Sequence, residues 1–598
     1  MLFMSSSPVL YHVTEPFYIM HRALSNVDIL SHIFMMLVYE CEDAEVDFAQ
    51  LLELEAAARV QLLRCATLCK DFCHPALDAL WWRLDNLVPL MRLLSCFIPT
   101  KIKRKVRPDP NNRFDNGILY IRKGELSRKE WLRFQSYAKR VRILNYPKQA
   151  SVTPHIIAQL SKWNDGEPLL PGLKELTWVP VSPTDTAALL LGTKSLELLH
   201  IVLDSIELPD HIAWLSHSEK VAVLSDPSNR SASDKHIEEL LKTYAGRTPR
   251  LNTLELSTPV HPSCLAPLTL FTKLQHISLR DTPINVDFLR SLSTLKGLES
   301  LLLNFGPVPN ARGSDQLIHG FPHLAHVELC ARAADMTLFF TLLNPLEALT
   351  SLELVYPNGA PETSSTYRRP LEAIRARGHA PRLARVKLDI TTRWRTHDTL
   401  GELVQPLLDP YFRTLANVAV SAPRSGYRVT AGDLEGMARA WPHLARLYLN
   451  WSARDSEGPG APPVTALAHF ARHCPDLRTL ILARIDTDAQ VPTDLKVVGT
   501  HRLQHLFTLG SCPVKDARGV GRYVFLLFPR LLMPYMDPRP SGWDEVLVWV
   551  SKYRDGWREK LLRLGVEKEE KREKAADSPP KVATQASTTG SKSLGDLD

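Results

Sequence analysis

The sequence predicts an α/β protein in which a small N-terminal domain of three helices precedes a solenoid of strand–helix repeats. Two observations lead to this prediction. Apolar residues recur at helical spacing in three short stretches between residues 26 and 84. From about residue 138 one short leucine-rich pattern recurs, at intervals of 23 to 26 residues in its most regular part. A chain of 598 residues is long enough to hold several such cores.

The first helix is expected over residues 26–39. Its apolar residues lie at i, i+3, i+4, i+7 and i+8, which forms one stripe: Leu30, Ile33, Phe34, Leu37 and Val38. Ser25 stands three residues before Asp28, an arrangement typical of a capping box at a helix N-terminus.

The second and third helices are expected around the stretch "CATLCKDFCH", Cys65 to His74. Helical spacing places six residues on one face: Leu62, Cys65, Ala66, Cys69, Phe72 and Cys73. Pro75 suits the first turn of a third helix, whose stripe would be Leu77, Leu80, Trp81 and Leu84. Three cysteines in a row also raise the possibility of a zinc or redox site. Zinc sites usually combine separated cysteine pairs, and a thiol on an apolar face is hard to ionise, so we expect neither.

These three stretches resemble an F-box domain, specifically the F-box-like modules of fungal proteins with long repeat regions. The resemblance is carried by "DILSHIFMML", "LLRCATLCKDF" and "PALDALWWRL", which begin at Asp28, Leu62 and Pro75. The chain departs from the family pattern in two places. Val27 stands where the family usually has proline, and the acidic stretch between the first two helices is longer than usual.

The resemblance implies that this domain docks onto a Skp-family adaptor and thereby joins a cullin–RING ubiquitin ligase. The docking residues that it implies are Ile29, Leu30, Ile33, Phe34, Leu37, Leu62 and Leu63. The alternative is that all of them form the internal core of a small helical domain. The first helix, however, also carries Met35 and Met36, which gives it more apolar surface than three short helices can bury.

The repeat pattern is apolar-x-x-apolar-x-apolar, in which the alternating apolar residues predict a strand. Clear copies begin at residues 251, 274, 298, 324, 349, 383, 415, 444 and 477, the pattern fades at 503, and looser copies precede residue 251. Intervals near 25 residues are those of leucine-rich repeats. Between two copies, Val286, Leu289, Leu292 and Leu295 have helical spacing, so each repeat is expected to contain a strand and a helix.

The expected organisation has five parts. They are a disordered N-terminus (1–19), the F-box-like domain (20–97), a basic linker (98–135), the leucine-rich-repeat solenoid with a C-terminal cap (136–555) and a disordered tail (565–598).

We found no sequence pattern that indicates catalysis. "GTKS", which begins at Gly192, has the end of a phosphate-binding loop but lacks the glycine that should precede it. No readable nucleophile–base pair occurs. We therefore expect no enzyme activity, no cofactor and no metal site. Candidate contacts for a target protein are the solvent-facing strand residues Glu255, Ser278, Arg280, Glu328, Glu353, Lys387, Tyr448 and Arg478.

Composition argues against other partners and compartments. The net charge of +7 is a small difference between 72 basic and 65 acidic residues, so nucleic-acid binding is not expected. No apolar run is long enough to span a membrane. The first twenty residues lack the features of a secretory signal, and nine cysteines without framework spacing suggest reduced thiols. We expect a cytoplasmic or nuclear protein.

The sequence thus predicts the substrate-recognition subunit of an SCF-type ubiquitin ligase. Its F-box-like domain would bind a Skp-family adaptor within a cullin complex, and its solenoid would bind a target whose identity cannot be deduced. The alternative is a leucine-rich-repeat scaffold without ligase association.

Overall fold

The computed structural model describes residues 26–39, 48–101, 118–146, 152–179, 190–202, 232–257, 260–306, 317–357, 363–391, 398–451, 461–492, 501–510, 514–532 and 542–557, together with Cys512 and Glu559. It forms two compact units. Unit 1 comprises Met1–Leu383 and Leu388–Thr392, and unit 2 comprises Ala384–Lys387 and Arg393–Asp598. The predicted disordered segments 1–19 and 565–598 lie outside the described residues.

Unit 1 begins with three helices, as the apolar stripes predicted: α1 (Val27–Tyr39), α2 (Phe48–Leu68) and α3 (Lys70–Leu80). The side chain of Asn26 caps α1, since its Oδ1 accepts the backbone N–H groups of Asp28 (2.9 Å) and Ile29 (3.3 Å). Ser25 of the predicted capping box lies outside the described residues.

The predicted boundary between the second and third helices was wrong. The chain breaks at Cys69, whose backbone is extended (φ −155°, ψ 169°), and Pro75 lies inside α3 instead of opening it. Consequently Cys65 lies in the last turn of α2, Cys69 lies at the break and Cys73 lies in α3, so the three cysteines do not share one helical face. The spacing was misleading because apolar residues continue at helical intervals on both sides of the break.

The segment predicted as a linker (98–135) is partly folded. It contains most of an antiparallel pair, β2 (Phe97–Lys101) with β3 (Ile118–Arg122), and then α5 (Arg128–Ala138). Aromatic residues pack this segment against α6 (Pro154–Trp163). Trp131 stacks on Phe134 with ring centroids 5.0 Å apart and meets Trp163 edge-on at 6.4 Å.

In the described part of the chain, fourteen parallel strands follow one another in chain order in one sheet, and β2 and β3 lie outside it. The first is β1 (Arg83–Leu84), which directly follows α3 and pairs with β4. Leu84, which was expected in the third helix of the F-box-like domain (20–97), therefore already belongs to the repeat sheet. The other sheet strands of unit 1 are β4 (Ile143–Tyr146), β5 (Glu175–Trp178), β6 (Leu198–Ile201), β7 (Thr253–Leu256), β8 (His276–Ile284), β9 (Ser300–Phe305), β10 (His326–Cys330) and β11 (Ser351–Tyr356).

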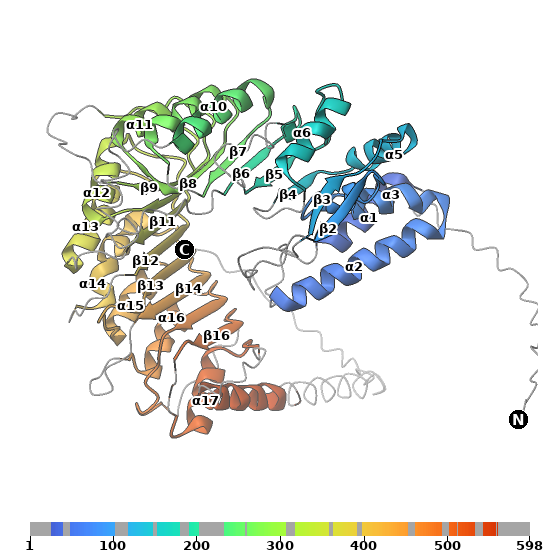
Figure 1. Cartoon of the computed structure of the whole chain (residues 1–598). Helices are drawn as coiled ribbons and strands as arrows, with labels where there is room; N and C mark the ends of the chain where they lie inside the picture. The colour runs from blue at the N-terminus through green and yellow to red at the C-terminus, as the bar shows by residue number, and fades with distance from the viewer. Residues whose placement is uncertain are drawn as a thin grey trace, which may run out of the picture. The chain divides into compact units, whose positions relative to one another are not determined.

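Helices alternate with these strands, and Figure 1 shows α10 and α11 on one side of the neighbouring strands β7, β8 and β9. The helical segments of unit 1 after α3 that have not yet been given are α4 (Val88–Met91), α10 (Ala232–Arg247), η3 (Pro262–Leu270), α11 (Val286–Leu292), α12 (Ala333–Leu342) and α13 (Ser364–Ala376). The helix predicted between two repeats is confirmed in α11, where Val286, Leu289 and Leu292 are buried.

β12 (Arg385–Ile390) has residues in both units, and unit 2 continues the same alternation. Its strands are β13 (Asn417–Ala422), β14 (Arg446–Trp451), β15 (Thr479–Leu482) and β16 (His505–Thr508). Its helical segments are α14 (Leu400–Val404), η4 (Gln405–Leu408), η5 (Pro410–Phe412), α15 (Ala431–Ala440), η6 (Val464–Ala466), α16 (Leu467–His473) and α17 (Ala517–Leu527), followed by helical residues 543–557.

The strands form where the sequence pattern predicted them, because every copy from Leu251 to Leu503 coincides with one of β7–β16. In β7, Leu254 and Leu256 are fully buried while Glu255 between them is partly exposed. Most strands alternate in this way, whereas in β9 and β10 residues of both sets are buried. Parallel strands in chain order, separated by helices, form a leucine-rich-repeat solenoid.

Candidate functional site

The three N-terminal helices enclose a small core. It consists of Leu30 and Phe34 from α1, Leu62 from α2, and Ala76 and Ala79 from α3. The ring of Phe34 meets that of Phe72 edge-on, with centroids 5.6 Å apart. This core buries one side of α1, and within the described residues no other element covers the opposite side.

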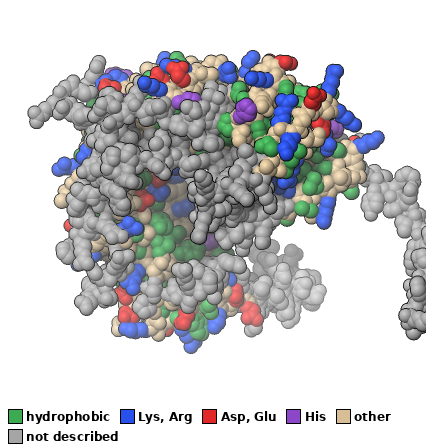
Figure 2. Space-filling view, viewed as in Figure 1, with side chains coloured by type: hydrophobic (Ala, Val, Ile, Leu, Met, Phe, Trp, Pro, Cys, Tyr) green, Lys and Arg blue, Asp and Glu red, His purple; other side chains and the backbone are tan. Residues whose placement is uncertain are grey.

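The outer side of α1 is apolar. Ile29, Ile33, Met36 and Leu37, which we call the apolar face, lie within about one-third of the helix circumference and are 38% to 48% exposed. On α2, Val60 and Leu63 are exposed as well, and hydrophobic side chains are visible at the surface in this region of Figure 2. A cluster of half-exposed aliphatic side chains on a short helix is typical of a surface that binds another protein.

The structure divides the predicted adaptor-binding residues into two groups. The buried group belongs to the core and is not accessible to a partner: Leu30, Phe34 and Leu62. The exposed group remains available for binding: Ile29, Ile33, Leu37 and Leu63. Sequence spacing placed members of both groups on one stripe of α1, and only the packing of α1 on the other two helices separates Leu30 and Phe34 from Ile33 and Leu37.

A depression lies beside Leu37, between the three helices. Ala58 and Leu62 of α2 and Ala79 and Leu80 of α3 also line it, and the charged residues Arg59 and Arg83 stand at its side. The guanidinium of Arg59 pairs with the carboxylate of Asp85 at 3.0 Å. The apolar face therefore continues into a depression with an apolar lining and a charged border, which suits an inserted apolar side chain.

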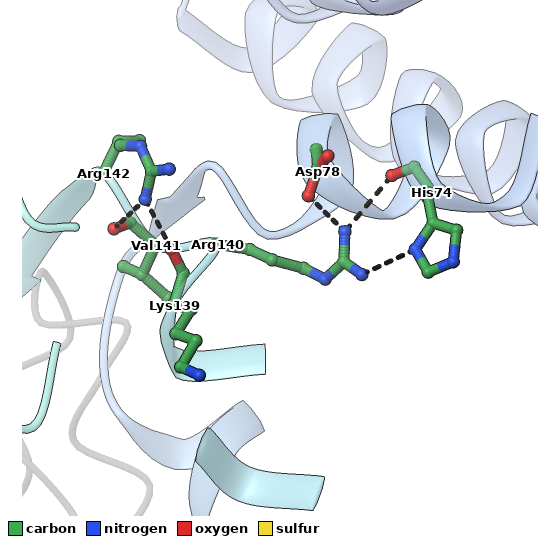
Figure 3. A network of polar contacts seen from close by, with 6 residues as sticks. All are labelled: His74, Asp78, Lys139, Arg140, Val141 and Arg142. Carbon is green, nitrogen blue, oxygen red and sulfur yellow. Dashed lines mark hydrogen bonds and ion pairs between the residues drawn. The ribbon is translucent and has the colours of Figure 1, made fainter. Parts of the chain in front are cut away.

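Arg140, which precedes the strand β4 of the solenoid, binds to His74 and Asp78 of α3 and so connects the three helices to the first repeats (Figure 3). Its Nη1 donates to the carboxylate of Asp78 and to the backbone carbonyl of His74 (3.3 Å), while its Nη2 lies 3.0 Å from Nδ1 of His74. Next to it, the ring of Trp81 packs on that of Tyr137 at 4.6 Å. Sequence analysis missed this junction, because nothing in the sequence indicates which of many arginines reaches back to α3.

Four predicted target contacts lie in one line on the open face of the sheet in unit 1. The register places Glu255 opposite Ser278, and Glu328 opposite Glu353, with Leu302 of β9 between the two pairs. Arg280 lies two residues after Ser278 on the same strand and is exposed. Strand alternation therefore placed these residues on the same side of the sheet, but Glu328 was wrongly expected to face solvent, because it is buried.

Several side chains of this row are engaged with one another. Arg280 Nη2 lies 2.7 Å from Oε2 of Glu328, which is largely buried. His200 lies 3.7 Å from the Glu255 carboxylate through Nδ1 and 3.0 Å from the Ser257 hydroxyl through Nε2. Burial, together with the carboxylates of Glu328 and Asp281, raises the pKa of the Cys330 thiol to about 11. A target would meet a pre-arranged polar surface and not a set of free charges.

The remaining three predicted contacts belong to unit 2. Lys387 is exposed, and Tyr448 is partly buried, with its hydroxyl accepting a hydrogen bond from Asn450 Nδ2 at 3.3 Å. Arg478 lies outside the row of Tyr448. It precedes β15, where its backbone N–H donates to the carbonyl of Ala445 (2.8 Å), so its side chain belongs to the edge at which the strands begin.

The described residues contain no group of three His, Cys, Asp or Glu side chains arranged to hold a metal ion. The "GTKS" segment forms a turn: the Thr193 and Ser195 hydroxyls donate to the Leu173 carbonyl at 2.9 Å and 3.0 Å. The His379 side chain connects its own repeat to the backbone of the preceding one through two hydrogen bonds. Its Nδ1 accepts the Leu346 N–H (3.1 Å), its Nε2 donates to the Phe340 carbonyl (2.8 Å), and burial lowers its pKa below 6.5.

Comparison with known proteins adds little to this description. No protein family model and no curated protein matches the chain. Among solved structures, the chain is similar to an internalin from Listeria monocytogenes str. 4b F2365, with 12% sequence identity and a TM-score of 0.25. That match covers 50% of this chain and 94% of the internalin chain. The assignment of leucine-rich repeats therefore depends on the strand order and register of this chain itself.

No helix in the described part of the chain has both the length and the apolar character needed to cross a membrane.

Proposed function

We propose that this chain is the substrate-recognition subunit of an SCF-type cullin–RING ubiquitin ligase. In this proposal the F-box-like helices bind a Skp-family adaptor and the repeat solenoid binds the target protein. The chain itself would carry out no chemistry, because ubiquitin transfer belongs to the partner complex. The proposal implies a cytoplasmic or nuclear location, where such ligases act.

The apolar face of α1 is the observation that best supports this proposal. Helices α1–α3 already possess a closed core, so Ile29, Ile33, Met36 and Leu37 are not required to complete it. Fully burying one aliphatic side chain contributes roughly 1.5–3 kcal/mol, and about half of each is already covered. Four such residues would supply several kcal/mol of binding free energy, and the exposed Leu63 of α2 offers further apolar surface.

The junction at Arg140 supports a mechanism based on proximity. Because Arg140 binds to α3 and is followed within three residues by β4, the adaptor surface is attached directly to the first repeats of unit 1. Two binding surfaces on one chain raise the local concentration of target near the transfer centre. A stiff junction increases this effect, since it reduces the number of unproductive orientations.

The alternative function is a repeat scaffold that binds proteins without joining a ligase. The departures from the F-box pattern favour it: Val27 replaces the usual proline, and the acidic stretch between the first helix and Leu62 is longer than usual, although most of it forms part of α2. Both functions include a target-binding solenoid, so only adaptor binding distinguishes them.

Co-purification from cells that express the full chain with a Skp-family adaptor and a cullin provides the test. We expect the wild-type chain to retain both partners and the Ile33→Ser/Leu63→Ser variant to lose them. Leu132→Ser is the matched control, because Leu132 is an apolar residue of α5 that is 57% exposed and lies outside the apolar face. If the wild-type chain retains no adaptor, the scaffold function is favoured.

A further inference from the structure

The edge at which the strands of unit 1 begin carries a regular column of side chains. One residue before each strand, a backbone N–H donates to the carbonyl of the equivalent residue in the preceding repeat. Asn252 donates to Glu197 (2.9 Å), Gln275 to Asn252 (2.8 Å) and Glu299 to Gln275 (2.8 Å). Neighbouring strands lie about 4.8 Å apart, so these side chains stand in a line with that spacing on a rigid backbone.

Basic residues stand beside this column on three successive repeats. Arg250 and Lys273 each precede the first leucine of their motif directly, and Lys296 precedes its motif by one further residue. All three are exposed, and within the described part of the chain none has an ion-pair partner. In the sequence these basic residues stand in "PRL", "TKL" and "KGL", which resemble ordinary turns before a strand.

Two of the basic residues, Arg250 and Lys273, line an open groove, and Lys296 directly precedes a third lining residue, Gly297. The groove lining is Glu197, Arg250, Asn252, Lys273, Gln275 and Gly297. The acidic groups in and beside it are engaged: Lys174 Nζ lies 3.2 Å from Glu197, and Gln275 donates to Glu299 at 3.1 Å. Among the described residues only Glu197 is neutralised by an ion pair, while three basic residues face the single remaining carboxylate of Glu299, so the groove and its border carry an excess of positive charge.

We propose that this groove binds an acidic segment of a partner protein in extended conformation. Its Asp or Glu side chains would pair with Arg250, Lys273 and Lys296. The Asn252 side chain could donate to the peptide backbone, since the bond from Thr253 Oγ1 uses only its Oδ1. A nucleic acid fits less well, because its continuous phosphate charge would also lie against Glu197 and Glu299. This surface lies outside the predicted target row, and the inference does not depend on the ligase proposal.

The test is a titration of the full chain against a fluorescein-labelled decapeptide of alternating Glu and Ser, followed by fluorescence anisotropy. We expect the Arg250→Ala/Lys273→Ala/Lys296→Ala variant to bind roughly tenfold more weakly, on the scale of three exposed ion pairs. Affinity should also fall between 50 and 200 mM salt, because such pairs are screened. The matched control is Arg128→Ala/Lys129→Ala/Arg133→Ala, which removes three exposed charges from α5 and should change nothing.

Three results would overturn the proposal. These are equal affinity in the groove and control variants, equal binding of a peptide with Gln in place of Glu, and tighter binding of single-stranded RNA through the same three residues. If the triple variant does not fold, Lys273→Gln alone should weaken peptide binding about two- to fourfold. Unchanged affinity in the Lys273→Gln variant would also overturn the proposal.

Discussion

Phe34 and Ile33 are adjacent on α1 but are expected to respond in opposite ways to substitution. Phe34 is 4% exposed and packs among Leu30, Leu62 and the edge of the Phe72 ring, whereas Ile33 is 41% exposed. Truncating a buried phenylalanine to alanine costs about 3–5 kcal/mol, which includes the cavity that it leaves. Truncating the exposed Ile33 should cost less than about 1 kcal/mol.

Hydrogen exchange of the amides in α1–α3, followed by mass spectrometry of the full chain, measures this difference locally. A loss of 3–5 kcal/mol corresponds to a fall in protection by a factor of roughly 150 to 5,000, since each 1.4 kcal/mol is tenfold. Phe34→Ala should show such a fall in α2 and α3, and Ile33→Ala should leave them nearly unchanged. Equal loosening in both variants would refute the division of α1 into a core side and a free apolar face.

Three further predictions concern the junction, pH and the C-terminal cap. Arg140→Ala should lower the protection of α3 by about 1 kcal/mol in hydrogen exchange, because the pair is partly exposed, while the neighbouring Lys139→Ala should not. Burial lowers the pKa of His379, so its contribution to the free energy of unfolding should be constant above about pH 6.5. Below that pH the free energy of unfolding should fall as the pH decreases toward the folded-state pKa, by at most about 1.4 kcal/mol per pH unit. Urea titrations at pH 8 and pH 5 measure this difference, and equal stability at the two pH values would contradict the prediction. Gly521→Ala would place a Cβ 2.6 Å from the neighbouring helix and should cost about 1–3 kcal/mol in thermal unfolding, whereas Gly556→Ala, which has open space around it, should be neutral.

The strands were predictable from sequence because each one repeats the same burial requirement. The first leucine of every motif, such as Leu251 or Leu274, must fill the core of its own repeat, and the alternation that follows marks the strand. The helix break at Cys69 was not predictable in this way. It depends on how α2 and α3 pack on one another, and apolar periodicity is the same on both sides.

The candidate site was predictable only in part, for the same reason. Periodicity identified α1 as unusually apolar, but it could not separate Phe34 from Ile33, since that depends on the position of α3. The row of Glu255 and Glu328 followed from strand alternation. The ion pair that engages Glu328 could not be foreseen, because Arg280 reaches it from two strands away.

The groove beside Arg250 and Lys273 was overlooked because each basic residue stood alone in the sequence. Only the register of the sheet brings residues 23 positions apart in the sequence onto neighbouring strands. Such surfaces arise from the repeat spacing, so they become visible when equivalent positions of successive repeats are aligned.

The most direct test of the proposed function is an equilibrium titration of the purified full chain with a purified Skp-family adaptor, by isothermal calorimetry. The account predicts saturable one-to-one binding that the Ile33→Ser/Leu63→Ser variant weakens at least about 30-fold and Leu132→Ser leaves unchanged, the scale of roughly 2 kcal/mol for two partly buried aliphatic side chains. Absence of binding by the wild-type chain, or equal binding by all three proteins, would contradict the assignment of the apolar face as the adaptor surface.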